Sequence, residues 1–358
     1  MDVEKFKKKN LDIKDCVELF ERDDLFFDIM KAADQLRYET VGDVVTYIMN
    51  ANINYTNICS GSCQFCAFSV GPKNPKAYFM TPKEVAEKTV IAKKEGLTEV
   101  CIQGGINDKV DTYYQESILK EIRKATDPLG GIMIHAFSPM DIVTGAENAG
   151  LDTKSAIKIL KEAGLDTIPG TAAEILVDDL RKELCSNKVS VDEWIKTIKQ
   201  AHNLGIKSTS TMMYGHIETS EDRTKHLKIL RDIQKDTNGF TEFILLPYLN
   251  DNTGFQKRGI LKSSASGQDD MKVTAISRLF FKDLIPNIQI PWVKLGVKFG
   301  QVCLNCGGND FSGSMFEDDI SESAGASYGT YMTREMYKDA IEKIGRIPKE
   351  RNTLYEYV

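Results

Sequence analysis

The sequence predicts an α/β fold, a TIM-type (βα)8 barrel preceded by an N-terminal helical cap. Short apolar runs alternate with amphipathic segments along most of the 358 residues, as repeated strand–helix units require. Barrels of such units often use this many residues as one domain. We expect the cap at residues 1–44, the barrel at 45–310 and a helical extension packed on the barrel at 311–358.

The apolar runs give the expected elements in order. The strands are predicted at 45–53, 99–103, 133–137, 166–168, 207–213, 242–248, 288–294 and around 302–304. The helices between them include 113–124, 154–163, 191–204, 221–235 and 270–284. Thr81 begins a further helix, because Pro82 suits the first helical position and Glu84 completes a capping box.

Composition excludes several classes of protein. The chain is 42% hydrophobic and 27% charged, which is ordinary for a globular protein. Its net charge of −6 argues against a nucleic-acid partner, because phosphate binding needs a basic patch. No apolar run reaches the ~18 residues of a membrane span. We expect a cytoplasmic location, where the 8 cysteines stay reduced.

Cys59, Cys63 and Cys66 are the most informative residues. Three thiolates on one short loop can hold three irons of a cubane 4Fe–4S cluster and leave the fourth iron open, whereas an electron-transfer cluster normally takes four cysteines. A structural zinc site would need four closed ligands, and no histidine follows at the required spacing. A disulfide framework is typical of short secreted chains and is not expected in a chain of 358 residues.

Polar residues and glycines follow the predicted strands at the barrel end where chemistry gathers. Glycines there let the backbone approach a ligand closely. The candidates are Gln103, Gly104 and Gly105 after the second strand, His135 in the third, Glu174 after the fourth and His216 after the fifth. His135 and His216 are the candidate catalytic residues, although a structural role is the commoner explanation for any single histidine. His202 and His226 are expected to be structural.

Several motifs resemble the second subunit of the deazaflavin (F0) synthase, a radical S-adenosylmethionine (SAM) enzyme family. They are Cys-x3-Cys-x2-Cys-Ala-Phe and the segments 100–105, 134–140, 169–176, 211–219, 239–243 and 292–296. The resemblance implies a radical SAM barrel with one 4Fe–4S cluster per chain and SAM. It also implies cofactor-binding roles for Gln103, Gly104, Gly105 and Glu174, with Phe68 as part of an apolar wall.

The resemblance further implies a reaction. A deoxyadenosyl radical takes hydrogen from the amino group of L-tyrosine, and the 4-hydroxybenzyl fragment adds to C5 of 5-amino-6-(D-ribitylamino)uracil. Polar groups on several strands could hold the ribityl chain, the uracil and the amino acid. The expected partners are the first subunit of F0 synthase and an electron donor such as ferredoxin or flavodoxin.

Two alternatives stay open. The related cyclic dehypoxanthine futalosine synthase of menaquinone biosynthesis shares much of the pattern, and a non-catalytic iron–sulfur or zinc protein is a different class. Cys303 and Cys306 depart from the family pattern, since a C-x2-C pair can bind metal or act as a redox dithiol. We expect them to pack as small apolar side chains.

Overall fold

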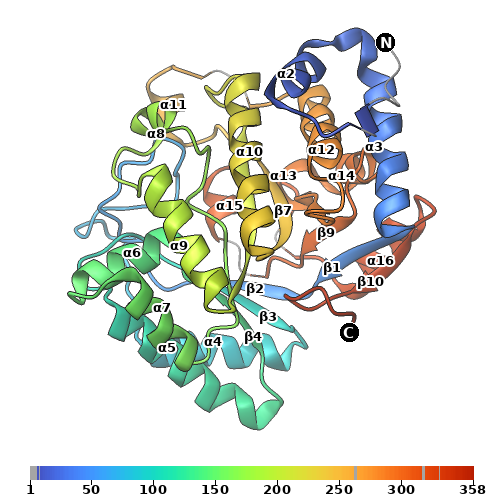
Figure 1. Cartoon of the computed structure of the whole chain (residues 1–358). Helices are drawn as coiled ribbons and strands as arrows, with labels where there is room; N and C mark the ends of the chain where they lie inside the picture. Colours follow the sequence, from blue (N-terminus) through green and yellow to red (C-terminus); the bar gives the residue numbers. More distant parts are fainter. Residues whose placement is uncertain (1–5, 8, 262–263, 317–318, 330) are drawn as a thin grey trace.

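The centre of the molecule is an all-parallel sheet that curls into a barrel, with helices outside it (Figure 1). The computed structural model describes residues 6–7, 9–261, 264–316, 319–329 and 331–358. Its strands are β1 (Val44–Ile48), β2 (Asn50–Asn54), β3 (Glu99–Gln103), β4 (Met133–Ala136), β5 (Thr167–Ile168), β6 (Lys207–Tyr214), β7 (Phe240–Pro247), β8 (Ile288–Gln289), β9 (Asp310–Gly313) and β10 (Ile347–Glu350). Their order is β10-β1-β9-β8-β7-β6-β5-β4-β3-β2.

The sheet closes because β1 and β2 are two halves of one extended stretch, separated by Met49 alone. β1 pairs with β9 and β10, while β2 pairs with β3. Beyond β9 the chain runs along β2, where the Phe316 N–H donates to the Asn50 carbonyl at 3.2 Å and the Asn52 N–H donates to the Phe316 carbonyl at 2.8 Å. β9 and the segment after it therefore lie along one side of this stretch and β3 along the other, which closes the barrel. The predicted TIM-type barrel is confirmed.

Helices connect successive strands and form the outer layer. They are α4 (Pro82–Lys94), α5 (Thr112–Thr126), the 3-10 turn η2 (Asp127–Leu129), α6 (Pro139–Asn148), α7 (Thr153–Glu162), α8 (Asp178–Leu184), α9 (Val191–Asn203), α10 (Ser220–Thr237), α11 (Gly254–Lys257), α12 (Gly267–Phe281), α13 (Trp292–Leu295), α14 (Val297–Leu304), α15 (Asp319–Ser323) and α16 (Arg334–Glu342). The predicted capping box of α4 is confirmed, because the Thr81 side chain accepts from the Glu84 N–H. Among the described residues, no helix is both long and apolar enough to cross a membrane.

The N-terminal region is helical and packs on the outside of the barrel. It comprises α2 (Ile13–Glu21), the 3-10 turn η1 (Asp23–Leu25) and α3 (Phe26–Val41), which contact α10 and α12. The buried Lys272 ammonium donates to the Phe20 carbonyl at 2.8 Å and pairs with Asp23 at 2.6 Å. These contacts fit the expected cap, while the division of the chain at residue 44 stays a prediction.

Two predicted strands are wrong in their bounds. Residues 302–304 belong to helix α14, and the last barrel strand is β9, eight residues later at its first residue Asp310. A short apolar run cannot distinguish a strand from the buried side of a helix. Here Cys303 and Leu304 are buried while Val302 is 41% exposed. The predicted strand 288–294 ends at Gln289, because Trp292 begins α13.

The C-terminal region, expected to be a helical extension, also supplies strand β10. β10 pairs with β1 from Val44 with Ile347 to Tyr47 with Glu350, at the amino end of the barrel. The chain then turns under the barrel, where Arg351 and Thr353 are buried. This end of the barrel is therefore closed by the C-terminal region.

Candidate active site

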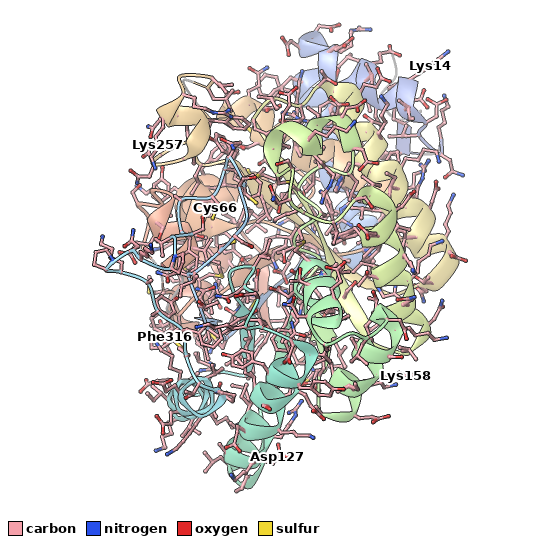
Figure 2. All side chains as sticks on the ribbon, turned by 90° about the vertical axis from the view of Figure 1, so that its left-hand side faces the viewer. Lys14, Cys66, Asp127, Lys158, Lys257 and Phe316 are labelled. Atoms are coloured by element: carbon pink, nitrogen blue, oxygen red, sulfur yellow. The ribbon has the colours of Figure 1, made fainter. Side chains whose placement is uncertain are left out.

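The three cysteines lie on the loop that leaves the carboxyl end of β2. Backbone hydrogen bonds fix this loop: the Cys59 N–H donates to Val70 at 3.2 Å, the Ser60 N–H to Ile106 at 2.8 Å and the Gln64 N–H to Leu184 at 2.8 Å. Figure 2 shows Cys66 on this loop, in the half of the molecule away from Asp127, which precedes β4. The neighbouring loops therefore determine where the thiols lie.

The thiols of the three cysteines line one cavity of about 220 Å³, together with Phe65 and Phe68. The Cys59 sulfur accepts from the Gly61 and Ile106 N–H groups, both at 3.2 Å. Among the described residues, no three His, Cys, Asp or Glu side chains cluster tightly enough for a single metal ion. Thiols spread around one cavity suit a cubane cluster, which takes one cysteine per iron.

Burial affects the chemistry of the central cysteine. It raises the pKa of the Cys63 thiol to about 12, and the nearby Lys188 opposes the shift. The free thiol is therefore protonated at neutral pH. Metal binding must release that proton, because the ligating form is the thiolate.

Gly104 and Gly105 follow β3 and lie against the cysteine loop. A Cβ on Gly104 would lie 2.3 Å from the Tyr55 ring, and one on Gly105 would lie 2.3 Å from the Ile58 carbonyl oxygen and 2.9 Å from the Cys59 Cβ. Both glycines line the cavity. Only a residue without a side chain permits this close approach.

A buried polar atom in the same cavity also lacks a partner. The side-chain nitrogen of Asn54 makes no hydrogen bond within the described parts of the chain, although the residue is only 5% exposed. An unpaired buried donor is costly unless a ligand supplies an acceptor. Three thiols, a glycine cradle and an unsatisfied amide together fit a 4Fe–4S cluster and a polar cofactor beside it.

An ion pair forms another wall of this cavity. Glu174 and Lys188 are hydrogen-bonded to each other, and both line the cavity. Burial alone would lower the pKa of Lys188, but the Glu174 carboxylate raises it well above its usual value, so the lysine is charged. Its ammonium lies 5.2 Å from the centre of the Phe65 ring. Sequence reasoning missed Lys188, which stands in the connection between α8 and α9 with no motif around it.

Gln103 joins this cavity to a second one inside the barrel. The second cavity has a volume of about 240 Å³, and Gln103, Thr171 and Ile320 line both. The Thr171 hydroxyl donates to the Gln103 side-chain oxygen at 3.3 Å. A molecule in the barrel can therefore lie beside a molecule in the cysteine-lined cavity.

The interior of the barrel is unusually polar. Barrel interiors are commonly filled by branched apolar residues, but here many of the inward positions carry amide, hydroxyl or carboxyl groups. These positions are Asn50, Asn52, Glu99, Gln103, Thr209, Thr211, Glu242 and Gln289. Sequence reasoning missed most of them. Their signal is a polar residue at every second position of a strand, as in Asn50-Ala-Asn-Ile-Asn54.

His135 lies in the barrel cavity, as predicted for a residue near substrate. Its Nδ1 is 2.7 Å from the Thr167 hydroxyl. Burial lowers the pKa of His135, so the ring is neutral. Its Nε2 has no hydrogen-bond partner among the described residues. The ring can therefore accept from, or donate to, a ligand in the cavity.

His216 lies elsewhere. It lines neither cavity, and its Nε2 is 3.1 Å from the Met213 carbonyl while its Nδ1 is 3.0 Å from Glu218. These contacts occupy the ring within its own loop. The structure thus brings Cys59, Cys63, Cys66, Phe68, Gln103, Gly104, Gly105 and Glu174 to one cavity, places His135 in the adjoining one, and separates His216 from both.

The remaining candidate motif, the pair Cys303 and Cys306, lies in the core of the protein. Cys303 and Cys306 are buried free thiols, and the Cys306 thiol donates to the Val302 carbonyl at 3.2 Å. His202 and His226 are buried as well. His202 is hydrogen-bonded to Thr237 and Ser208, as expected for a structural histidine.

A parallel barrel with three cysteines on the loop after its first strand defines the class as a radical SAM enzyme. The model of the Radical SAM superfamily matches residues 53–230, and that of the CofH/MqnC C-terminal region matches residues 237–358. Membership of the superfamily implies a 4Fe–4S cluster and SAM binding.

Full-length relatives indicate which family within the radical SAM superfamily the chain resembles. The chain is 55% identical over all 358 residues, 100% of both chains, to 5-amino-6-(D-ribitylamino)uracil–L-tyrosine 4-hydroxyphenyl transferase 1 of Methanococcus maripaludis. It is 55% identical over 356 residues, 99% of both chains, to the transferase of the same name from Methanocaldococcus jannaschii. The chain belongs to this family of radical SAM transferases. The predicted family and class of enzyme are confirmed.

Solved structures share the fold. Methylornithine synthase matches with a TM-score of 0.70 at 18% identity, covering 96% of this chain and 95% of its own. The FeFe-hydrogenase maturase HydG of Carboxydothermus hydrogenoformans matches with a TM-score of 0.74 at 14% identity, covering 99% of this chain and 79% of its own. At these identities the likeness concerns the fold alone.

Proposed function

We propose that the chain cleaves L-tyrosine and transfers its 4-hydroxybenzyl group to C5 of 5-amino-6-(D-ribitylamino)uracil, a step of F0 and coenzyme F420 biosynthesis. Iminoacetate, methionine and 5′-deoxyadenosine are the other products. Relatives at 50–55% identity over the full chain are named for this transfer. The structure supports the proposal through one feature in particular, the two adjoining cavities.

Each cavity suits one part of the reaction. The cysteine-lined cavity holds groups for a cluster and a polar cofactor, and the barrel cavity holds polar groups for substrates. Because they share Gln103 and Thr171, a substrate can lie directly beside the cofactor. Such placement provides much of the rate of an enzyme whose cofactor performs the difficult bond cleavage.

The roles of the residues follow from their positions. Cys59, Cys63 and Cys66 hold one cluster per chain, and Gly104 and Gly105 leave room beside it. When bound, the cluster and SAM supply the radical that takes a hydrogen atom from tyrosine. Asn54 and the Glu174–Lys188 pair bind the polar parts of the cofactor, while Phe65 and Phe68 exclude water.

Of the two candidate catalytic histidines, His135 is the one we retain as a substrate-contacting group. The residue lines the barrel cavity, and its Nε2 has no hydrogen-bond partner in the described parts of the chain. We assign His216 a positioning role in its own loop, because its ring is held by Met213 and Glu218. Replacing His135 by Asn is expected to reduce adduct formation while iron content stays at the wild-type level.

The partners remain as predicted from the family. The first subunit of F0 synthase would receive the product, and a ferredoxin or flavodoxin would supply electrons. A cytoplasmic location fits such donors.

The test is anaerobic incubation of the reconstituted enzyme with reductant, SAM, tyrosine and the diaminouracil, followed by mass analysis. Ring-labelled tyrosine should give a labelled 4-hydroxybenzyl adduct only when the diaminouracil is present. Omitting tyrosine is the control. Absence of the adduct despite 5′-deoxyadenosine formation would contradict the proposal.

The futalosine synthase alternative is tested in the same experiment. That reaction cyclises dehypoxanthine futalosine and consumes no amino acid. Turnover of this substrate without tyrosine would replace the proposed function but leave the radical chemistry intact. The names of the full-length relatives favour the transferase.

A further inference from the structure

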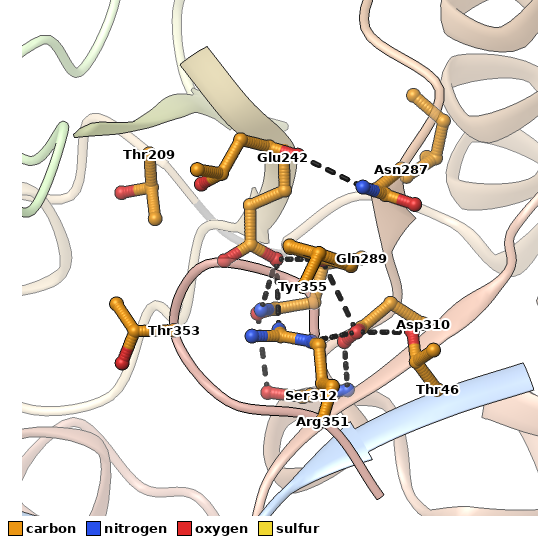
Figure 3. A network of polar contacts seen from close by, with 12 residues as sticks. Thr46, Thr209, Glu242, Asn287, Gln289, Asp310, Ser312, Arg351, Thr353 and Tyr355 are labelled. Atoms are coloured by element: carbon orange, nitrogen blue, oxygen red, sulfur yellow. Dashed lines mark hydrogen bonds and ion pairs between the residues drawn. The ribbon is translucent and has the colours of Figure 1, made fainter. Parts of the chain in front are cut away.

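The floor of the barrel cavity, at the amino ends of the strands, is a charged network (Figure 3). Arg351 lies at its centre, donating from Nε to Asp310 at 2.6 Å and from Nη2 to Glu242 at 3.1 Å. Tyr355 donates from its hydroxyl to Glu242 at 2.7 Å, and its ring lies 4.0 Å from the Arg351 guanidinium carbon. Gln289 also donates to Glu242, at 2.8 Å.

The two carboxylates around Arg351 differ in how fully they are used. Both oxygens of Asp310 accept hydrogen bonds, one from the Ser312 N–H and the other from Thr46 and Arg351. All three hydrogen bonds to Glu242 fall on Oε2. Within the described residues Oε1 has no partner, although Glu242 is only 4% exposed. Figure 3 shows this oxygen turned toward the side on which Thr209 and Thr353 lie.

Glu242, Thr209 and Thr353 all line the barrel cavity, so the free carboxylate oxygen faces it. Glu99 lines the same floor, with Asn50 3.3 Å from one oxygen and Thr353 donating to the other. His135 lies above them with a free Nε2. Both Glu99 oxygens already accept a hydrogen bond, whereas Glu242 Oε1 accepts none from the described residues, which is costly unless a ligand donates to it.

The charge of the floor restricts what that ligand can be. Three acidic side chains, Glu99, Glu242 and Asp310, lie around one guanidinium, and Arg351 is already paired with Glu242 and Asp310. Burial raises the pKa of Glu242 to about 7, so this group is only partly ionised at neutral pH. A carboxylate ligand such as the head of tyrosine would be repelled. Hydroxyl groups carry no charge and donate hydrogen bonds, and bonds to charged acceptors are the stronger kind.

We propose, resting on the proposed function, that this floor is the subsite for the ribityl chain of the diaminouracil. Its hydroxyls donate to Glu242 Oε1 and Glu99, and the uracil ring lies above, near His135. From Glu99 to Gln103 the strand rises roughly 13 Å. An elongated molecule standing on the floor thus presents its ring toward Gln103 and Thr171, where the two cavities meet, and tyrosine lies between ring and cofactor.

The test compares the natural diaminouracil with an analogue that carries an ethylamino group in place of ribitylamino. We expect wild-type enzyme to lose about 100-fold in kcat/KM on the analogue, because several hydrogen bonds to charged acceptors disappear. Glu242→Gln can keep its carbonyl toward Arg351 and turn its amide into the cavity. It should lose about 10- to 100-fold on the natural substrate and change little on the analogue.

Matched variants separate recognition from folding. Glu99→Gln is a second floor variant with the same expected selectivity. Glu350→Gln removes a carboxylate that pairs with Arg334 outside the cavity and should affect neither substrate. Iron content per chain should stay at the wild-type value in Glu242→Gln, because Glu242 lines the barrel cavity and not the cysteine-lined one. The subsite would be overturned if Glu242→Gln lost kcat/KM equally on both substrates. It would also be overturned if wild-type enzyme had the same kcat/KM on the natural substrate and on the analogue.

Equilibrium dialysis of the diaminouracil against unreduced holoenzyme separates this inference from the proposed function. Binding that weakens in Glu242→Gln while no adduct ever forms would support the subsite and refute the transfer reaction. Adduct formation without any preference for the ribityl chain would support the transfer reaction and refute the subsite.

Discussion

The two ends of the barrel are built by different means. At the carboxyl end, backbone hydrogen bonds and glycines place the thiols, so the path of the chain fixes the site. At the amino end, buried charges on separate strands and on the C-terminal region hold one another in place. Under the proposed function, one end supplies reactivity and the other recognition, so we expect that each can be disturbed without the other.

The largest expected effect is at the carboxyl end. Cys63→Ala removes the ligand of one iron, so cluster content should fall sharply and 5′-deoxyadenosine formation should cease. Iron analysis and chromatography of the products measure both. Cys306→Ala is the matched control. Continued SAM cleavage by Cys63→Ala would refute the ligand assignment.

The corresponding change at the floor concerns stability. Arg351→Met leaves Glu242 and Asp310 buried without their cation, which should lower the free energy of unfolding by about 3–5 kcal/mol. Arg334→Met, which breaks a partly exposed pair with Glu350, should cost at most about 1 kcal/mol. Anaerobic denaturant titration compares them. An equal loss of unfolding free energy in the two variants would mean that the buried network contributes no more to stability than the partly exposed pair.

A third prediction concerns pH and the loop after β6. Burial alone would raise the pKa of Glu218, but His216 and Arg223 hold it at about 2, below its ordinary value of 4.5. Because the folded-state pKa is lowered, the stabilisation is complete above 4.5 and is lost as pH falls toward 2. It amounts to about 3 kcal/mol.

Glu218→Gln should therefore flatten the acid limb of the stability curve, measured by denaturant titration from about pH 7 to about pH 3. Glu221→Gln, on an exposed turn of α10, is the control. A variant curve parallel to that of the wild type would contradict the assignment.

A smaller effect tests the glycine cradle. Gly105→Ala would place a Cβ 2.3 Å from the Ile58 carbonyl oxygen and shift the cysteine loop. A displacement of about 1 Å can reduce a rate about 100-fold, and we expect that loss in SAM cleavage. Gly71→Ala has no atom near its Cβ and should cleave SAM at the wild-type rate. Dialysis of the diaminouracil should give the same affinity for both.

The smallest effect is expected for the second cysteine pair. Cys306→Ala removes a buried thiol and its hydrogen bond to Val302, at a cost of about 1 kcal/mol, and leaves iron content unchanged. Iron analysis and thermal unfolding measure the two quantities. Loss of several irons per chain would show that the pair binds metal.

The difference between the two ends also explains what the sequence could reveal. Cys59, Cys63 and Cys66 lie within eight residues of one another and Gly104 and Gly105 are adjacent, so each group can be recognised as a short motif. Glu99, Glu242 and Arg351 lie far apart in the chain and meet only in the folded barrel. No local pattern connects them.

The fold was predictable where the period of the pattern was clear. Long strands such as β6 and β7 were found near their true bounds, while the two-residue strand β8 and strand β9 were not. The run around Val302 predicts a strand as readily as a helix, because three apolar residues fit either structure. His216 shows the same limit for sites: following a strand places a residue at the correct end of the barrel, but only its contacts show where it points.

The pairing of β1 with β10 has a consequence for biosynthesis. The strand that begins at Val44 cannot pair with β10 until Ile347 has been synthesised, about 300 residues later. At roughly 5–20 residues per second, that interval lasts roughly 15–60 s. Until then the nascent barrel has an open edge, and Glu242 and Asp310 lack their arginine. The loop that carries Cys59, Cys63 and Cys66 is therefore translated about 285 residues before Arg351, which closes the amino end of the barrel.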